Sequence, residues 1–216
     1  MIDTSVFPVP GPRAASSPVV DFWFDPLCPW AWMTSRWMDE VSVRRDVEVR
    51  WHVMSLAILH ESADDTPASR NEPNSAWGPV RVIVAAAQLH GEKYVKALYD
   101  AMGTRLHPGA QSDLAVVIDE SLAQVGLPSE LADLARSDEF DALLRASHEG
   151  AIALVGRDVG TPVVAIDGAG YFGPVVTPAP TGDAALRLWD GLVLMAGVPG
   201  FYELKRSRTD GPVFAS

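Results

Sequence analysis

The sequence predicts an α/β fold in which an all-helical subdomain interrupts a small mixed sheet. Three observations predict it: a strand–helix–strand pattern near the N-terminus, a long middle section with helical periodicity alone, and a strand, a hairpin and a helix near the C-terminus. The chain has 216 residues, a length that suits one domain with a sizeable insertion.

The first strand and the first helix are expected on either side of Cys28. Residues 19–24 are rich in β-branched and aromatic side chains, which favours a short strand. Asp25 and the residues after it break this pattern. Pro29 suits the first position of a helix, because the N–H group that it lacks is unbonded there. A helix is therefore expected from about Pro29 to Val43.

A second strand precedes the helical section. Apolar and polar residues alternate from Val47 to Met54, which predicts a strand with one buried face. The polar segment 61–75 is expected to form a loop or lid. Helices are then expected over these segments: 77–91, 94–102, 112–126 with Ser112 as N-cap, a short one from Pro128, and one opened by Ser137, Asp138 and Glu139 and ended by Gly156. In the last helix, Leu143 and Leu154 are expected on the buried face.

The C-terminal elements complete the pattern. Residues 161–166 predict a strand, Asp167-Gly168 a hairpin turn into 169–172, and 182–196 a helix. The first two strands should be parallel, because a helix connects them, and the last two antiparallel. This order is that of a thioredoxin-like fold with an inserted all-helical subdomain. The chain is expected to divide into these parts: a flexible N-terminal arm (1–18), a thioredoxin-like domain (19–60 and 157–205), a helical insertion (61–156) and a C-terminal tail (206–216).

Composition narrows the possible functions. The formal net charge is -11, from 28 acidic and 17 basic side chains. This charge argues against nucleic acid or an anionic membrane as partner, because both need clustered Lys and Arg. No segment approaches the roughly 20 apolar residues of a membrane span, and the N-terminal residues lack the pattern of a signal peptide. The single cysteine excludes an internal disulfide, so a cytoplasmic location is expected.

Cys28 is the residue best placed for chemistry. It follows a strand and precedes Pro29 at a helix start, where free N–H groups and the helix dipole favour an anion. The thiolate is the nucleophilic form of cysteine, and such a position is expected to lower the thiol pKa. The alternative is an inert, buried cysteine that acts as a small hydrophobe. Thr161-Pro162 supplies a second element, because in thioredoxin folds a cis-proline loop at this place faces the active cysteine.

The chain lacks the second cysteine of a dithiol oxidoreductase. Such an enzyme resolves its mixed disulfide by exchange with a nearby thiol. Ala31 stands at that place, in the order Cys28-Pro29-Trp30-Ala31, and the chain has no other cysteine. A mixed disulfide on Cys28 must therefore be resolved by a second molecule, most simply a low-molecular-weight thiol.

Other side chains are weaker candidates. His60 follows the second strand, where it can polarise a substrate or stabilise a thiolate if the chain returns over Cys28. Trp30 can form a wall of an aromatic substrate site. The remaining histidines are expected to be structural or exposed: His52, His90, His107 and His148. No metal-ligand spacing and no glycine-rich phosphate loop is present, so neither a metal site nor a nucleotide site is expected.

A family resemblance rests on five segments: Phe22–Trp30, His52–Leu59, Trp77–Arg81, Val159–Pro162 and Phe172–Val175. Together they closely resemble the actinobacterial mycothiol-dependent nitroreductases, in the DsbA-like branch of the thioredoxin superfamily, over nearly the whole chain. The resemblance implies a cytoplasmic enzyme that takes electrons from mycothiol and reduces nitro-aromatic compounds, often as a homodimer. It implies Cys28 as the attacking cysteine, Trp30 as a substrate-site wall and Thr161-Pro162 as the cis-proline loop. Ala31 departs from the family pattern, which has a second cysteine there.

Three functional hypotheses follow. The first is a thiol-disulfide oxidoreductase or nitroreductase with a monothiol mechanism: Cys28 forms a mixed disulfide with mycothiol or a similar thiol, and electrons pass to a small aromatic or disulfide substrate. The second is a thiol-cofactor transferase or isomerase resembling the kappa glutathione transferases and hydroxychromene carboxylate isomerases. The third is a binding protein without turnover. The residues expected to bind thiol or substrate are these: Pro29, Trp30, His60, Thr161 and Pro162.

Overall fold

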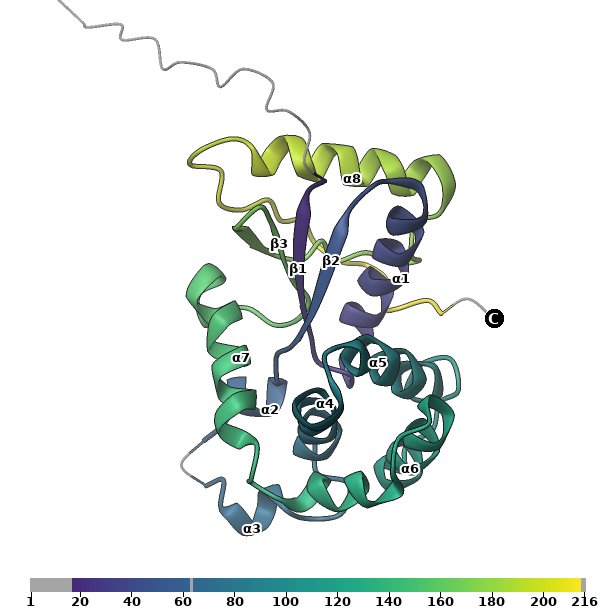
Figure 1. The fold of residues 1–216 in the computed structure, drawn as a ribbon. Helices are drawn as coiled ribbons and strands as arrows, with labels where there is room; N and C mark the ends of the chain where they lie inside the picture. Colours follow the sequence, from purple (N-terminus) through teal and green to yellow (C-terminus); the bar gives the residue numbers. More distant parts are fainter. Residues whose placement is uncertain (1–16, 63, 215–216) are drawn as a thin grey trace, which may run out of the picture.

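The structure, a computed structural model, describes residues 17–62 and 64–214. Its centre is a four-stranded sheet in the order β2-β1-β3-β4. A block of helices formed by residues 77–136, called here the helical block, lies at one end of the sheet (Figure 1). The predicted α/β fold with a helical insertion is confirmed. The arm expected for residues 1–18 lies almost entirely outside the described residues.

The sheet is mixed, as the order of its elements predicts. Its strands have these bounds: β1 (Val19–Phe24), β2 (Glu48–Val53), β3 (Val163–Ile166) and β4 (Ala169–Phe172). β1 is parallel to β2 and antiparallel to β3, and β3 forms a hairpin with β4. The parallel pair is possible because α1 carries the chain back between its two strands.

The helices have these bounds: α1 (Pro29–Arg44), α2 (Leu56–Leu59), α3 (Pro67–Arg70), α4 (Trp77–His90), α5 (Lys93–Leu106), α6 (Leu114–Val125), the 3-10 helix η1 (Ser129–Arg136), α7 (Asp141–Val155) and α8 (Gly182–Ala196). In the part of the chain that the structure describes, none of them is long and apolar enough to cross a bilayer.

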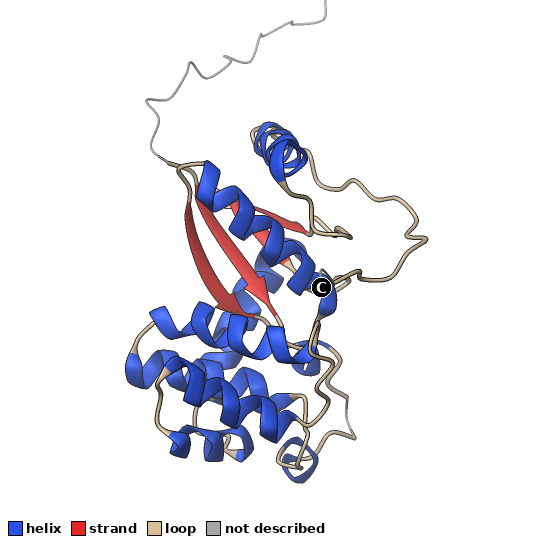
Figure 2. Ribbon diagram, turned by 90° about the vertical axis from the view of Figure 1, so that its right-hand side faces the viewer, coloured by secondary structure: helices blue, strands red, loops and turns tan. Residues whose placement is uncertain are grey.

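The two faces of β1 belong to different cores. Phe22 and Phe24 are fully buried in a large cluster that includes Trp37 of α1 and residues of α8 and the helical block. Trp23 points to the opposite face and packs in a smaller cluster with Ile152 of α7. This alternation follows from the pleat of a strand. Because apolar side chains point to both faces, helices pack on both faces of the sheet (Figure 2).

The helical block joins the sheet where β1 and β2 end. The ring of Tyr99 in α5 stacks on that of Phe24 with their centroids 3.8 Å apart. The large cluster therefore continues from the sheet into the helical block. A buried ion pair joins this block to α7: Arg81 of α4 is 2% exposed and makes two hydrogen bonds to the Asp141 carboxylate, with N–O distances of 2.7 and 2.8 Å.

Segment 61–75 is not the simple loop that its polarity suggests. It contains α3, whose first turn is held by reciprocal hydrogen bonds between Thr66 and Ser69. Glu61 pairs with Arg145 of α7 at an N–O distance of 2.8 Å, and also with Arg70. Polar residues here make caps and ion pairs, which composition alone does not distinguish from a loop.

Two helix starts also differ from expectation. Asp113, and not Ser112, caps α6, because its carboxylate accepts the N–H groups of the first turn at 3.0 and 3.4 Å. α7 begins at Asp141, several residues after Ser137, with no side-chain cap.

The apolar pattern of α7 is likewise misleading. Leu143 and Leu154 are 44% and 41% exposed, although their spacing predicts the buried face. The helix instead buries the side that carries Leu144, His148 and Ala151. This side faces the helical block at one end and the sheet at the other, so its position depends on both neighbours.

Candidate active site

Cys28 occupies the turn between β1 and α1. Its backbone is extended, and its sulfur accepts the Ala31 N–H group at 3.4 Å, so Cys28 is itself the N-cap of α1. Pro29 follows at the first helical position. The strand-to-helix turn thus places the sulfur over the free N–H groups of the helix.

The Thr161-Pro162 loop lies directly against this sulfur. The Thr161-Pro162 peptide is cis, and the Cys28 thiol donates to the Thr161 carbonyl oxygen at 3.3 Å. The Pro162 carbonyl in turn accepts the Gly173 N–H group at 2.8 Å, which ties the loop to the end of β4. The two elements that the sequence separates by 133 positions are therefore in contact.

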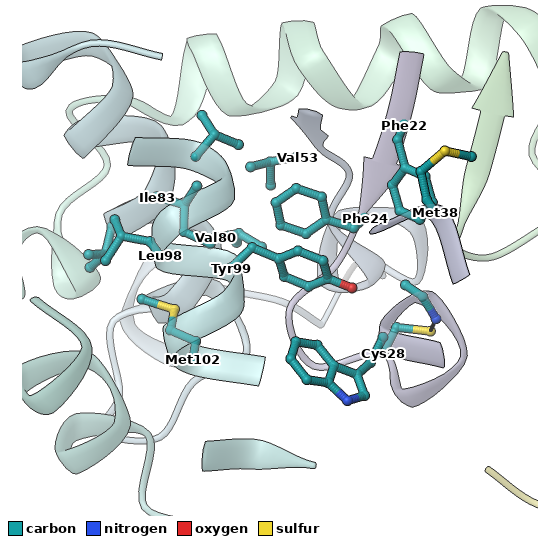
Figure 3. Packing of buried hydrophobic residues seen from close by; sticks show 14 of the residues in the cluster. Phe22, Phe24, Cys28, Met38, Val53, Val80, Ile83, Leu98, Tyr99 and Met102 are labelled. Atoms are coloured by element: carbon teal, nitrogen blue, oxygen red, sulfur yellow. Dashed lines mark hydrogen bonds between the residues drawn. The ribbon is translucent and has the colours of Figure 1, made fainter. Parts of the chain in front are cut away.

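The cysteine is more buried than its place in the sequence suggests. It is 6% exposed, and Figure 3 shows it at the edge of the large cluster, with the Tyr99 hydroxyl pointing towards it. Burial raises the pKa of the Cys28 thiol, and the charge of Asp25 adds to the rise, while hydrogen bonding by Thr161 and by the Ala31 N–H group works in the opposite direction. The expected low thiol pKa is therefore wrong for the free protein, because desolvation outweighs the helix N-terminus.

Asp25 is the site residue that sequence reasoning missed. It is 1% exposed, and its carboxylate accepts the N–H groups of Leu27 at 2.8 Å and Leu56 at 2.7 Å. It therefore joins the Cys28 turn to the start of α2. Burial raises the pKa of Asp25 from 3.8 to about 6, against the opposing effect of its two hydrogen bonds and the charge of His60. An Asp-Pro pair after a strand is an ordinary turn signal and does not reveal this burial.

The other expected binding residues lie around the turn. Trp30 is half-buried, and the guanidinium of Arg208 lies over its ring, 4.9 Å from the ring centroid. His60 ends α2 and is exposed. It follows the short helix whose first residue, Leu56, donates to Asp25, and it makes no hydrogen bond to Cys28 within the described chain.

Two histidines have environments that the sequence did not reveal. His107 at the end of α5 is 9% exposed and donates from Nε2 to the Pro26 carbonyl at 3.0 Å. It packs between Trp32 and Phe214, and burial lowers its pKa to about 4, so it is neutral at physiological pH. His148 is fully buried in α7, where neither ring nitrogen has a hydrogen-bond partner in the part of the chain described. These contacts join segments far apart in sequence, and no local pattern indicates them.

The site consists of a thiol, a carboxyl group and backbone amides. Among residues 17–62 and 64–214, no cluster of three or more His, Cys, Asp or Glu side chains is arranged to hold a metal ion. The Thr161 carbonyl faces the Cys28 sulfur directly, at 3.3 Å, so the loop before Pro162 lies beside the position where a reacting thiol would meet Cys28.

Comparison with known proteins gives the family. Residues 27–206 match the model of the Rv2466c-like family, described as mycothiol-dependent nitroreductase Rv2466c. The uncharacterized protein Rv2286c of Mycobacterium tuberculosis is 33% identical over 196 residues, which cover 90% of this chain and 84% of that protein.

Solved structures give the fold. A protein from Streptomyces coelicolor described as probable DsbA oxidoreductase SCO1869 has a TM-score of 0.58 at 18% identity, covering 92% of this chain and all of the other. The cytosolic disulfide reductase DsbM of Pseudomonas aeruginosa, solved with GSH, has a TM-score of 0.51 at 18% identity, covering 81% of this chain and 99% of the other. The chain thus has the DsbA-like thioredoxin fold and belongs to the Rv2466c-like family of mycothiol-dependent nitroreductases.

Proposed function

We propose that the protein is a thiol-dependent oxidoreductase in which Cys28 is the single reactive thiol and mycothiol, or a similar low-molecular-weight thiol, is the electron donor. The contact of the Cys28 sulfur with the carbonyl before cis-Pro162 is the observation that carries this proposal. Membership of the nitroreductase family supports a small nitro-aromatic compound as acceptor, and the fold supports a disulfide.

The single thiol dictates the order of electron transfer. Cys28 and one mycothiol molecule together supply two electrons to a nitro group, which becomes a nitroso group and releases water, while the two sulfurs join in a mixed disulfide. A second mycothiol attacks that disulfide, regenerates the Cys28 thiol and leaves as oxidised mycothiol. With a disulfide acceptor, Cys28 bonds to one sulfur and the other leaves as a thiol. Mycothiol then attacks the acceptor's sulfur in this mixed disulfide, which frees Cys28 and leaves a disulfide between mycothiol and that sulfur. Ala31 carries no thiol that could do so.

The environment of Cys28 shapes the first step. Because burial raises its pKa, the resting sulfur is a protonated thiol that donates to Thr161. The thiolate must therefore form during the reaction. The Ala31 N–H group, which already donates to the sulfur, can stabilise its negative charge. A thiol with a high pKa is a strong nucleophile once it is deprotonated.

The raised pKa of the Cys28 thiol also favours a second function. A protonated Cys28 can donate a hydrogen bond to the thiolate of a bound thiol cofactor, as a transferase or isomerase resembling the kappa glutathione transferases requires. In that case the cofactor's sulfur, and not Cys28, attacks the substrate. A Cys28→Ser variant keeps a donor at this place, so it should retain activity in the second function and lose it in the first.

The test of the proposal is modification of Cys28. After incubation with oxidised mycothiol, mass spectrometry should show one mycothiol unit on Cys28 and none on a Cys28→Ser variant. Unmodified Cys28, under conditions where a denatured control reacts, would refute it. The Ala31→Cys variant tests the monothiol step. Its added thiol should displace the bound mycothiol and leave an internal disulfide, which the parent chain cannot form.

A cytoplasmic location, where low-molecular-weight thiols are kept reduced, fits this cycle. The homodimer that the family resemblance implies stays a prediction, which light scattering of the purified chain can check.

A further inference from the structure

The chain after α8 runs as a strap to the junction of the sheet and the helical block. We call residues 197–214 the C-terminal strap. Figure 2 shows it leaving α8 as a wide loop and returning near the start of α1. Two hydrogen bonds of Thr177 fix the end of the strap. The Thr177 Oγ1 donates to the Gly211 carbonyl at 3.2 Å and accepts the Val213 N–H group at 2.8 Å.

Two side chains of the strap reach the surroundings of Cys28. Phe214 stacks on His107, with ring centroids 5.6 Å apart, and His107 is hydrogen-bonded to the turn that carries Cys28. Arg208 lies over the ring of Trp30, which is in the first turn of α1, two residues after Cys28. The strap therefore packs beside the turn that carries Cys28 and the first turn of α1.

The strap carries a cluster of cations in a strongly acidic protein, and Arg208 is the one that contacts the surroundings of Cys28. The chain has a net charge of -11, yet the strap carries Lys205, Arg206 and Arg208 within four consecutive positions, flanked by Glu203 and Asp210. All three cations are exposed, and none forms an ion pair within residues 17–62 and 64–214. Their charges are thus available to a ligand.

We propose that Arg208 is a specificity-determining residue, which gives the Cys28 site a preference for aromatic acceptors that carry a negative charge. The ring of such an acceptor packs against Trp30, and its carboxylate pairs with the Arg208 guanidinium, whose planar fork suits two parallel hydrogen bonds. The inference rests on the proposed function, because it names the acceptor class for the same thiol.

The test compares two aromatic disulfides that differ in charge. Cys28 attacks one sulfur of dithiobis(nitrobenzoate), which is dianionic, or of dithiodipyridine, which is neutral. In each case a Cys28–aryl disulfide forms, the S–S bond of the reagent breaks, and an aromatic thiolate leaves and absorbs light. Both reagents meet the same fraction of thiolate, and their intrinsic reactivities are the same for every variant, so a change in the ratio of their rates between variants isolates the effect of the acceptor's charge.

The ratio of anionic to neutral rate should fall by about threefold to tenfold at low salt in an Arg208→Gln variant. Arg208→Lys, which keeps the charge and loses the fork, should lie between that variant and the parent. The matched control is Arg187→Gln, which removes the same charge from the exposed face of α8, at the far end of the sheet (Figure 1). Salt of about 0.5 M should reduce the parent's preference. Equal ratios in the Arg208→Gln and Arg187→Gln variants would overturn the proposal.

Calorimetry provides a measurement that needs no reaction at Cys28. The parent should bind nitrobenzoate more tightly than the neutral nitrobenzamide, and Arg208→Gln should abolish the difference; equal affinities in the parent would overturn the inference. If this preference is found but oxidised mycothiol leaves Cys28 unmodified, the proposed function fails and the charge preference stands. If the mycothiol adduct forms but no preference is found, the inference about Arg208 alone fails.

Discussion

Replacing Asp25 by asparagine should remove a pH dependence from the stability of the fold. Asp25 is 1% exposed, and burial raises its pKa from 3.8 to about 6. The folded chain therefore holds this proton up to a higher pH than the unfolded chain does. The stability that the protonated carboxyl contributes is fully present below pH 3.8 and is lost as the pH rises through about 6.

The size of the effect follows from the two pKa values. A rise from 3.8 to about 6 corresponds to about 3 kcal/mol in the free energy of unfolding between acid and neutral pH. Solvent screening does not reduce this figure much, because the group is almost completely buried. Asparagine also loses one acceptor for the N–H groups of Leu27 and Leu56, at about 1–3 kcal/mol. This loss is the same at every pH, so it cancels from the comparison.

Urea denaturation of the parent and of Asp25→Asn, from about pH 4 to about pH 7.5, measures the effect. Relative to the variant, the parent should lose about 2.5 kcal/mol of stability over this range, because the unfolded chain is already partly ionised at about pH 4. A constant difference between the two proteins would refute the assigned burial of an ionisable Asp25. The variant should also react with iodoacetamide at lower pH than the parent, because the Asp25 charge contributes to the raised pKa of Cys28.

Two predictions concern stability alone. Gly103→Ala places a Cβ atom 2.3 Å from the Trp32 ring, which should destabilise the fold by about 1–3 kcal/mol. The matched control Gly150→Ala, with its nearest atom 3.8 Å away, should stabilise α7 by up to about 1 kcal/mol; equal effects of the two variants in urea denaturation would contradict the assigned packing. Asp141→Ala leaves the charge of Arg81, which is 2% exposed, without its partner and should cost about 3–5 kcal/mol. A loss below about 1 kcal/mol in the same assay would show that this ion pair contributes no more to stability than an exposed one.

Local patterns were sufficient for most of the fold and for part of the site. Alternation, helical spacing and turn residues predict the strands and helices of the sheet region, including α8, whose bounds match the prediction. Cys28 before Pro29, and Thr161 before Pro162, were recognisable because a helix start and a proline loop are properties of neighbouring residues. The absence of a second cysteine is a property of composition, and it limits the chain to one-thiol chemistry.

Tertiary packing decided the electrostatics of the site. The pKa of Cys28 is raised and not lowered, because burial in the core removes water from a sulfur that the helix N-terminus alone would stabilise as a thiolate, and the charge of Asp25 adds to the rise. The positions of His107 and Arg208 depend on contacts between segments far apart in the chain. Desolvation depends on everything that surrounds a group, and most of those neighbours come from elsewhere in the sequence. Local sequence therefore places the sulfur, and long-range packing determines how reactive it is.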